Sequence, residues 1–303
     1  MLYRKTILWP RDGYFRDSPE LPPPTHADRL WVHVMLFVLT VFTTTMVGAM
    51  MEGNDPSGSF GGFASGFPFS FTILAILGIH EFAHYAAGKK WGISVTLPYF
   101  IPAPFPPIGT FGAVIRMKSS IPNRKALVDV GAAGPIAGFV VALAASIIGL
   151  SLSNVIPLQG RGPDSITLGD SLLFRLLSYL VIGPIPPNQD VMLHPVAFAG
   201  WIGLFVTALN LMPFGQLDGG HVLFALSPNL HELLRRIGVP LLLLLGITLW
   251  SGWFVWAVLL IFIGGPHPYP DYMETRLGPL RTALAVCALV MFFACMIPVP
   301  VRT

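Results

Sequence analysis

Charged residues are scarce in this sequence. Asp, Glu, Lys and Arg make up 11% of its 303 residues, whereas hydrophobic residues make up 53%. A soluble globular domain carries about 25% charged residues. A chain so poor in charge cannot present a solvated surface on all sides, and its mean hydropathy of +0.68 agrees. The composition therefore excludes an ordinary soluble protein and places the chain in the membrane class.

Cysteines and dense runs of basic residues are also scarce. Cys287 and Cys295 are the two cysteines, and both lie in one apolar stretch. They exclude a disulfide framework and a zinc site built from thiolates. The net charge of +3 arises without a dense basic run, so we expect no nucleic-acid partner. A small basic excess in a membrane protein is typical of its cytoplasmic loops.

Long apolar stretches predict an α-helical integral membrane protein with about six transmembrane helices, and the lipid bilayer is therefore an expected partner. A helix needs roughly 20 residues to cross the hydrocarbon layer. The expected spans are residues 30–51, 69–88, 126–152, 194–212, 237–264 and 280–297. Shorter helices are expected at 170–181 and 219–236.

These spans divide the chain into four parts. Residues 1–29 are expected to be a cytoplasmic segment, 30–68 the first span with its loop, 69–227 a three-span core, and 228–303 the last two spans. The core contains two inserts, a polar loop at 153–193 and a segment at 91–125. The segment 91–125 is apolar but rich in proline, so it cannot be a helix. We expect short membrane-associated β-strands there.

The distribution of Lys and Arg predicts the orientation. Six basic residues fall between the second and third spans, whereas the loop at 52–68 has none. They are Lys89, Lys90, Arg116, Lys118, Arg124 and Lys125. Cytoplasmic loops carry such an excess, so six spans would place both termini in the cytoplasm.

The sharpest functional motif is His80-Glu81-Phe82-Ala83-His84, inside the second expected span. Residues four apart share one face of a helix, so both imidazoles can reach one metal ion. Glu81 stands beside them, where a carboxylate can accept a proton from water. A charged residue at the centre of a span costs about 2.5–3.5 kcal/mol on insertion scales, so this cluster indicates function. The alternative is a satisfied polar cluster between helices.

A catalytic zinc ion needs three protein ligands, and Asp218 is the candidate for the third. It follows a break at Pro213 and Gly215. Non-helical backbone at membrane depth is tolerated where it lines a cavity or is buried in protein. Gly219 and Gly220 permit close approach of the backbone. The alternative is that Asp218 caps the next helix, although capping would not exclude ligation.

These motifs resemble those of the site-2 protease family of intramembrane metalloproteases. The resemblance rests on HEFAH at 80–84 and NLMPFGQLDGG at 210–220, with weaker matches in GTFGAVI at 109–115 and in the segment 131–138. It implies a three-helix catalytic core made of the second, third and fourth spans.

The resemblance also implies a site and an activity. One zinc ion per chain would be held by His80, His84 and Asp218, with Glu81 as the general base. We expect a zinc metalloendopeptidase that hydrolyses peptide bonds in or near transmembrane segments, and that cuts single-span membrane proteins near their cytoplasmic end. The chain looks most like the compact prokaryotic members, which predicts a prokaryotic cell (inner) membrane. It has no inserted PDZ or CBS domain, so regulation by a partner tail or a nucleotide lacks support.

Two further features are expected to contact the substrate. Asn210 is a candidate for a hydrogen bond to the substrate or its oxyanion; the alternative is a structural bond between helices. An extended substrate in a membrane needs partners for its backbone, and an edge strand can supply them by β-augmentation. The alternative is a surface hairpin that only shields the site. The strand residues are Gly109, Thr110, Phe111, Gly112, Ala113 and Val114.

Small residues form a stripe on the third expected span, and we expect this stripe to pack closely against the helix with the histidines. Asp129 either caps this span or lines a path for water. His221 is not expected to be a ligand, because three ligands suffice. The stripe consists of Gly131, Gly134, Gly138, Ala142, Ala145 and Gly149.

Three other functions fit parts of the pattern. An inactive relative could serve as a membrane scaffold, but all the expected catalytic groups are present. A metal-ion transporter would spread carboxylates and histidines over several spans, whereas here they converge on one site. An unrelated membrane zincin would take a glutamate as its third ligand, and the later spans hold none.

Overall fold

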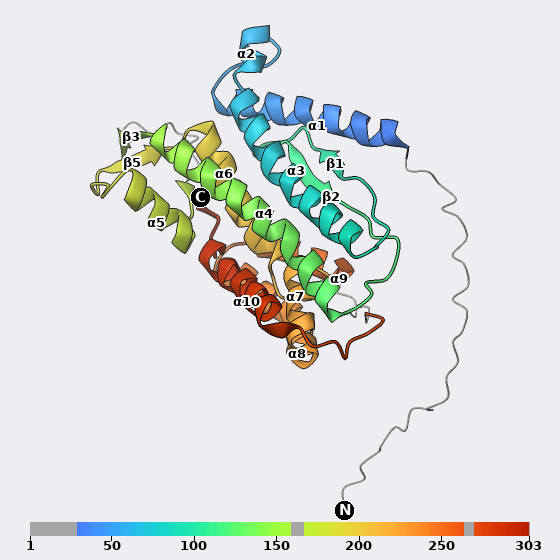
Figure 1. Cartoon of the computed structure of the whole chain (residues 1–303). Helices are drawn as coiled ribbons and strands as arrows, with labels where there is room; N and C mark the ends of the chain where they lie inside the picture. Colours follow the sequence, from blue (N-terminus) through green and yellow to red (C-terminus); the bar gives the residue numbers. More distant parts are fainter. Residues whose placement is uncertain (1–28, 159–166, 264–269, 303) are drawn as a thin grey trace, which may run out of the picture.

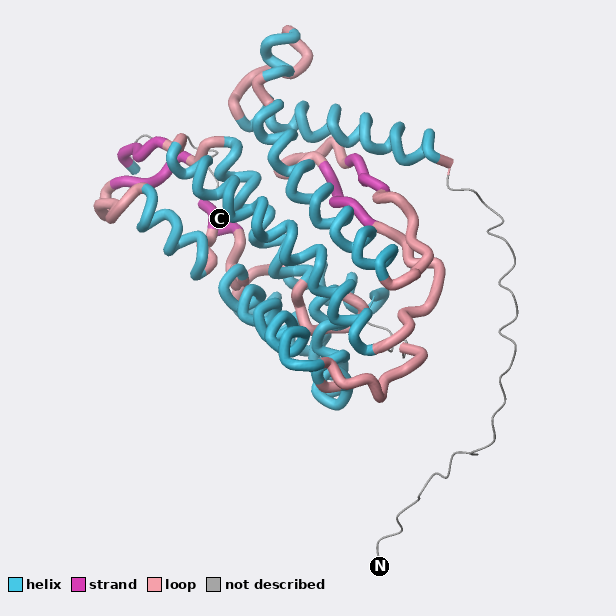
Figure 2. Tube along the Cα trace, viewed as in Figure 1, coloured by secondary structure: helices cyan, strands magenta, loops and turns pink. Residues whose placement is uncertain are grey.

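The computed structural model describes residues 29–158, 167–263 and 270–302. Nearly all of the expected segment 1–29 lies outside these residues. Helices dominate the described chain, and the strands are short (Figures 1 and 2). The helices are α1 (Leu30–Met51), α2 (Phe60–Ala64), α3 (Phe67–Lys90), α4 (Arg124–Ser151), α5 (Leu172–Val181), α6 (Pro195–Asn210), α7 (Asp218–Leu226), α8 (Pro228–Thr248), α9 (Trp253–Ile263) and α10 (Gly278–Cys295). The strands are β1 (Tyr99–Pro102), β2 (Thr110–Val114), β3 (Asn154–Pro157), β4 (Thr167–Leu168), β5 (Gln189–Met192) and β6 (Val301–Arg302).

Helices α3, α4 and α6 form the centre of the molecule, and each packs against the other two. The sequence starts these helices in recognisable ways. Asn123 caps α4, because its side-chain oxygen accepts hydrogen bonds from the backbone N–H groups of Lys125 and Ala126. Pro68 lies in the first turn of α3 and Pro195 is the first residue of α6, where a missing N–H costs nothing.

Four helical segments in the described ranges are long and apolar enough to cross a membrane. This supports a membrane protein, whereas the expected number of six spans stays a prediction. Helix α6 has 16 residues, which is short of the roughly 20 that a crossing needs. The four segments are Leu30–Met51, Phe60–Lys90, Arg124–Ser151 and Gly278–Cys295.

The expected single span at 237–264 is wrong. Helix α8 ends at Thr248 and α9 begins at Trp253, so the chain turns between them. The two helices pack against each other. A Cβ at Gly246 would lie 2.7 Å from the Phe254 ring, so glycine lets them approach closely. The uniformly apolar sequence concealed this turn, because Ser251-Gly252 is a weak signal within it.

The expected helix at 219–236 also divides into two. Helix α7 ends at Leu226, Ser227 is extended, and Pro228 is the first residue of α8. A residue before proline is disfavoured in the helical conformation. Ser227 instead caps α8, since its hydroxyl accepts from the Leu230 N–H.

Contacts at both ends of α4 and α10 fix the relative direction of these two helices. Arg281 near the start of α10 pairs with Asp129 near the start of α4. At the other end of these helices, β6 pairs with β4, which follows α4 in the chain. Helices α4 and α10 therefore run in the same direction (Figure 1). The C-terminal strand lies at the end of the bundle opposite the basic loop, and the cytoplasmic location of the two termini stays a prediction.

The proline-rich insert forms strands, as the sequence predicts. Strands β1 and β2 pair in an antiparallel hairpin with Tyr99 opposite Val114. The hairpin lies between α1 and α3 (Figure 1). His33 of α1 bonds the Pro98 carbonyl at 3.0 Å, and the Thr43 hydroxyl donates to the Gly109 carbonyl at 2.8 Å. These two contacts fix the hairpin along α1 at its base and at its turn.

Candidate metal centre

Helix α3 places two histidines side by side at the centre of the molecule. His80 and His84 are both buried. Their Nε2 atoms lie 3.1 Å apart, as expected for residues one helical turn apart on one face. The structure thus brings the two predicted histidines together.

Asp218 comes to the same point from the break between α6 and α7. Its Oδ2 lies 3.2 Å from His84 Nε2 and 3.4 Å from His80 Nε2. Leu217 occupies the N-cap position and Asp218 is the first residue of α7, so the carboxylate is not the cap. A Cβ at Gly219 would collide with the Leu211 carbonyl. Glycine at this position therefore lets α7 fold back against the end of α6.

These three side chains form a potential metal-binding group, and their separations are close to those that zinc requires. Tetrahedral zinc with ligands at 2.0–2.2 Å requires ligand atoms about 3.3–3.6 Å apart. The observed separations are 3.1, 3.2 and 3.4 Å, so one lies in this range and two lie just below it. His221 is outside this group.

The contacts of His84 are compatible with metal binding. His84 Nδ1 lies 2.8 Å from the Val130 carbonyl oxygen and must donate to it, so in the neutral ring Nε2 carries a lone pair. Nε2 faces an aspartate oxygen at 3.2 Å. Either a metal ion between these two atoms or a proton on Nε2 satisfies both of them. Pro135 of α4 has no N–H, so the Gly131 carbonyl, next to Val130, lacks its helical donor.

The stripe of small residues on α4 has three packing partners. Its first member, Gly131, lies against α7, where a Cβ would be 2.9 Å from the His221 Cβ. At Gly134 a Cβ would lie 2.6 Å from His84 Cε1 and nearer still to Nε2, and at Gly138 it would lie 3.1 Å from His80 Nδ1. The end of the stripe meets α6 instead. A Cβ at Gly203 of α6 would lie 2.8 Å from the Ala142 Cβ, and one at Gly149 would collide with Ala197. The expected packing against α3 thus describes only the half of the stripe beside the histidines.

Glu81 and Asn210 lie at the edge of the cluster. The Glu81 Oε1 is 4.0 Å from His80 Nε2, farther than any pair among the three ligands. Glu81 is buried. Asn210 Nδ2 is 3.4 Å from His80 Nε2. The structure thus brings both residues to the cluster, with the Glu81 carboxylate outside the group of three candidate ligands.

Strand β2 packs against α3, the helix that carries the two histidines. Gly109 has a φ of +79° and is fixed to α1 through Thr43. Thr110 and Ala113 are buried, whereas Phe111 and Val114 are exposed. Gly112 also has a positive φ, of 98°, a conformation that favours glycine.

Asp129 has a role that the sequence analysis did not identify. Its carboxylate accepts two hydrogen bonds from Arg281, each 2.9 Å long, and one from Trp91 Nε1 at 3.1 Å. Asp129 therefore ties α10 and the end of α3 to α4. No local signal in the sequence points to Arg281, because the partners are 152 residues apart.

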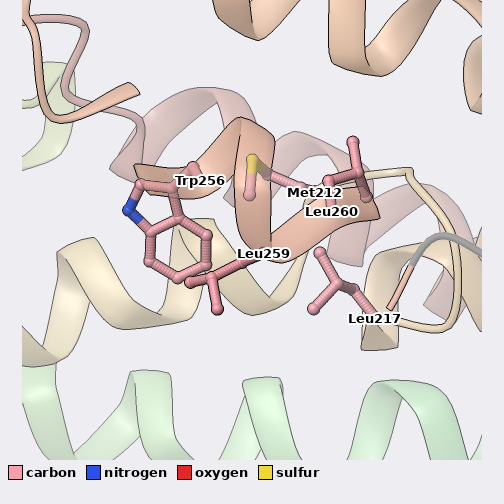
Figure 3. A pocket seen from close by; sticks show the side chains of 5 residues that line it. All are labelled: Met212, Leu217, Trp256, Leu259 and Leu260. Atoms are coloured by element: carbon pink, nitrogen blue, oxygen red, sulfur yellow. The ribbon is translucent and has the colours of Figure 1, made fainter. Parts of the chain in front are cut away.

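Helix α9 packs against the break that precedes Asp218. Figure 3 shows Met212 and Leu217 from the break opposite Trp256, Leu259 and Leu260 from α9. The cavity between them is about 10 Å³, room for one water molecule at most. This apolar contact therefore supports the break and is not a ligand site.

Comparisons with known proteins agree with this site. Residues 68–245, more than half of the chain, match the model of peptidase family M50. The chain is 30% identical over 286 residues to rice (Oryza sativa subsp. indica) "Probable zinc metalloprotease EGY2, chloroplastic", covering 88% of this chain and 51% of the relative. It is 28% identical to Arabidopsis thaliana "Probable zinc metalloprotease EGY1, chloroplastic", covering 95% of this chain and 56% of that relative. The chain thus spans about half the length of the curated relatives it matches. No solved structure matches it.

Proposed function

We propose that this chain, which belongs to peptidase family M50 of zinc metallopeptidases, hydrolyses peptide bonds in or near the transmembrane segments of other membrane proteins. The observation that carries the proposal is the convergence of His80, His84 and Asp218 beside Glu81. The long apolar helices support a location in a membrane. The two relatives described above are named as chloroplast proteins, so the expected prokaryotic cell membrane stays a prediction.

Each side chain at the site has a chemical role in the proposal. Zinc held by the two histidines and Asp218 would lower the pKa of water from about 15.7 to about 7 and polarise the scissile carbonyl. Glu81 accepts the proton of the attacking water and returns it to the leaving amine. The Asn210 amide donates a hydrogen bond to the substrate oxygen as negative charge develops there. The Val130 carbonyl holds the ring of His84 in place.

Removal of the anionic ligand tests the proposal. Asp218→Asn should weaken zinc binding by more than the roughly 10–100-fold that loss of an outer-shell partner costs, because a neutral amide replaces the carboxylate. Cleavage of a single-span membrane reporter should be lost as well. Zinc content after dialysis against a chelator and the release of the reporter fragment are the measurements.

The control for this variant is Asp271→Asn. Asp271 is a carboxylate outside the cluster that accepts from Ser120, so this change should preserve zinc content and cleavage. Normal zinc content and turnover in Asp218→Asn would refute the assignment of Asp218 as a ligand. A zinc-loaded wild-type protein that cleaves no reporter in a varied panel would refute the proposed activity.

Strand β2 is the proposed docking edge for an unwound, single-span substrate. In an extended strand the N–H groups of residues two apart point to the same side. The Arg116 carbonyl accepts from the Thr96 N–H, so the backbone groups of Arg116 and of Val114, two residues earlier, point to the side of β1. The N–H groups of Ala113 and Ile115 then point away from β1. A substrate added beside β2 would thus lie at the edge away from β1, and β2 also packs against α3, the helix that carries Glu81.

Proline substitutions at Ala113 and Val114 each remove one N–H, so they test the two sides of strand β2 separately. Ala113→Pro removes a donor that would face the substrate, and an unsatisfied backbone group costs about 1–3 kcal/mol. We expect kcat/KM to fall by about 5–100-fold on that basis. Val114→Pro removes a donor to β1 and should have the smaller effect on cleavage. Both variants should retain zinc and insert into the membrane. The strand does not hold the substrate if cleavage is unchanged in both.

A further inference from the structure

Helix α7 cannot set the position of Asp218 by itself. It has nine residues, and a helix this short is marginal in isolation because nucleation is costly. Asp218 is its first residue, so any shift or fraying of α7 moves the carboxylate. The contacts at the two ends of α7 therefore decide where Asp218 lies.

Arg124 holds the C-terminal end of α7. Its Nε donates to the Ala225 carbonyl, and its Nη2 donates to the Leu226 carbonyl at 3.1 Å. The last carbonyls of a helix lack partners within the helix. Pro228 follows closely and offers no N–H. The guanidinium thus satisfies two carbonyls and places positive charge at the negative end of the helix dipole.

His231 holds the break that leads into α7. It is buried at 1% exposure, and its Nε2 bonds the Gly215 carbonyl at 3.0 Å. Gly215 has a φ of +54°, so the chain turns sharply there. A Cβ at Gly220 would collide with the same carbonyl. The Gly215 carbonyl is therefore enclosed between α7 and His231, three residues before Asp218.

Arg124 also ties α7 to the helix that orients a histidine. Arg124 is the first residue of α4, and the same helix supplies the Val130 carbonyl to His84. Helix α4 therefore provides a common frame for His84 and Asp218, which come from segments 134 residues apart.

We infer that Arg124 and His231 are positioning residues for Asp218, one at each end of α7, and that they act on zinc affinity without touching the ligand atoms. The inference rests on the proposed zinc site. It gives Arg124 a function beyond the basic charge that orients a loop. Orienting a loop requires only a positive charge, whereas bonding two carbonyls at once requires the forked geometry of the guanidinium.

The test for Arg124 compares zinc affinity among three variants in purified, membrane-embedded protein. Arg124→Ala should raise the zinc Kd by about 10–100-fold, the range for lost outer-shell partners. Arg124→Lys keeps the charge but not the fork, so its Kd should lie between that of Arg124→Ala and the wild type. Lys125→Ala removes a neighbouring charge and should leave the Kd unchanged. The Kd is measured by competition with a chelator.

Two substitutions at His231 distinguish the effect of side-chain shape from the effect of the hydrogen-bond donor. His231→Phe fills similar space without a donor and should raise the zinc Kd, whereas His231→Gln retains a side-chain N–H and should restore most of the affinity. Thermal unfolding of the zinc-free proteins supplies the second readout. The inference predicts a larger fall in unfolding temperature for the zinc-loaded variants than for the zinc-free variants, because the loss of zinc affinity adds to the loss of the hydrogen bonds.

Each outcome bears on a particular claim. Unchanged zinc Kd values in Arg124→Ala and His231→Phe would overturn the inference while leaving the zinc site intact. A fall in unfolding temperature that is the same with and without zinc would show a general structural role and would also overturn it. A wild-type protein that binds no zinc would refute the proposed function itself.

Discussion

Replacing Glu81 with glutamine is expected to abolish peptide hydrolysis while leaving zinc in place. Glu81 Oε1 lies 4.0 Å from His80 Nε2, outside the triangle of ligand atoms. Glutamine has the same shape but cannot accept a proton from water. General base catalysis contributes about 10²–10⁴-fold, so cleavage of a membrane reporter should fall by about that factor. Zinc content should stay near one ion per chain.

The matched control is Glu232→Gln. Glu232 lies on α8, away from the cluster, and pairs with Arg235 and Arg236. Its replacement should leave reporter cleavage and zinc content unchanged. Loss of zinc from Glu81→Gln would mean that Glu81 is a ligand. Retained cleavage would mean that another group accepts the proton.

The largest expected loss of zinc from a change outside the ligands is that of Gly134→Ala. A Cβ there would lie 2.6 Å from His84 Cε1 and closer to Nε2, so the methyl group and the imidazole cannot both keep their positions. His84 must turn away from the Val130 carbonyl, and its Nε2 then leaves the triangle. We expect zinc affinity to fall at least as much as the roughly 10–100-fold caused by a lost outer-shell partner.

Alanine substitutions at two other glycines serve as comparisons for the loss of zinc affinity in Gly134→Ala. Gly138→Ala should cost less zinc affinity, because its Cβ would lie 3.1 Å from His80 Nδ1, a gap that a small shift can relieve. Gly61→Ala should change nothing, since its nearest neighbour would be 4.0 Å away. Equal zinc affinities across the three variants would show that α4 does not shape the site. Chelator competition on purified protein measures all three.

The cluster was predictable from the sequence because most of its geometry is local. His80 and His84 meet through helical periodicity alone. Asp218 required more, namely a break in an apolar stretch and the resemblance of its surrounding motif to a known family. The strands were predictable because proline excludes a helix in that segment.

The remaining features depend on contacts between distant segments. Nothing near Arg124 indicates the carbonyls of Ala225 and Leu226, and nothing near Asp129 indicates Arg281. The turn between α8 and α9 escaped detection because an apolar run can hold one helix or two.

The proposed docking on strand β2 would set how much additional length a substrate must supply. The strand has five residues, and a paired partner of equal length would extend over about 17 Å. The same five residues span only about 7.5 Å as a helix. Uncoiling would therefore lengthen the segment by about 9.5 Å, roughly a third of the 30 Å hydrocarbon layer. A membrane helix pinned tightly at both surfaces cannot absorb this increase, so docking on β2 would favour substrates with a loose tether at one end. The dependence of cleavage on the length of that tether measures this additional length.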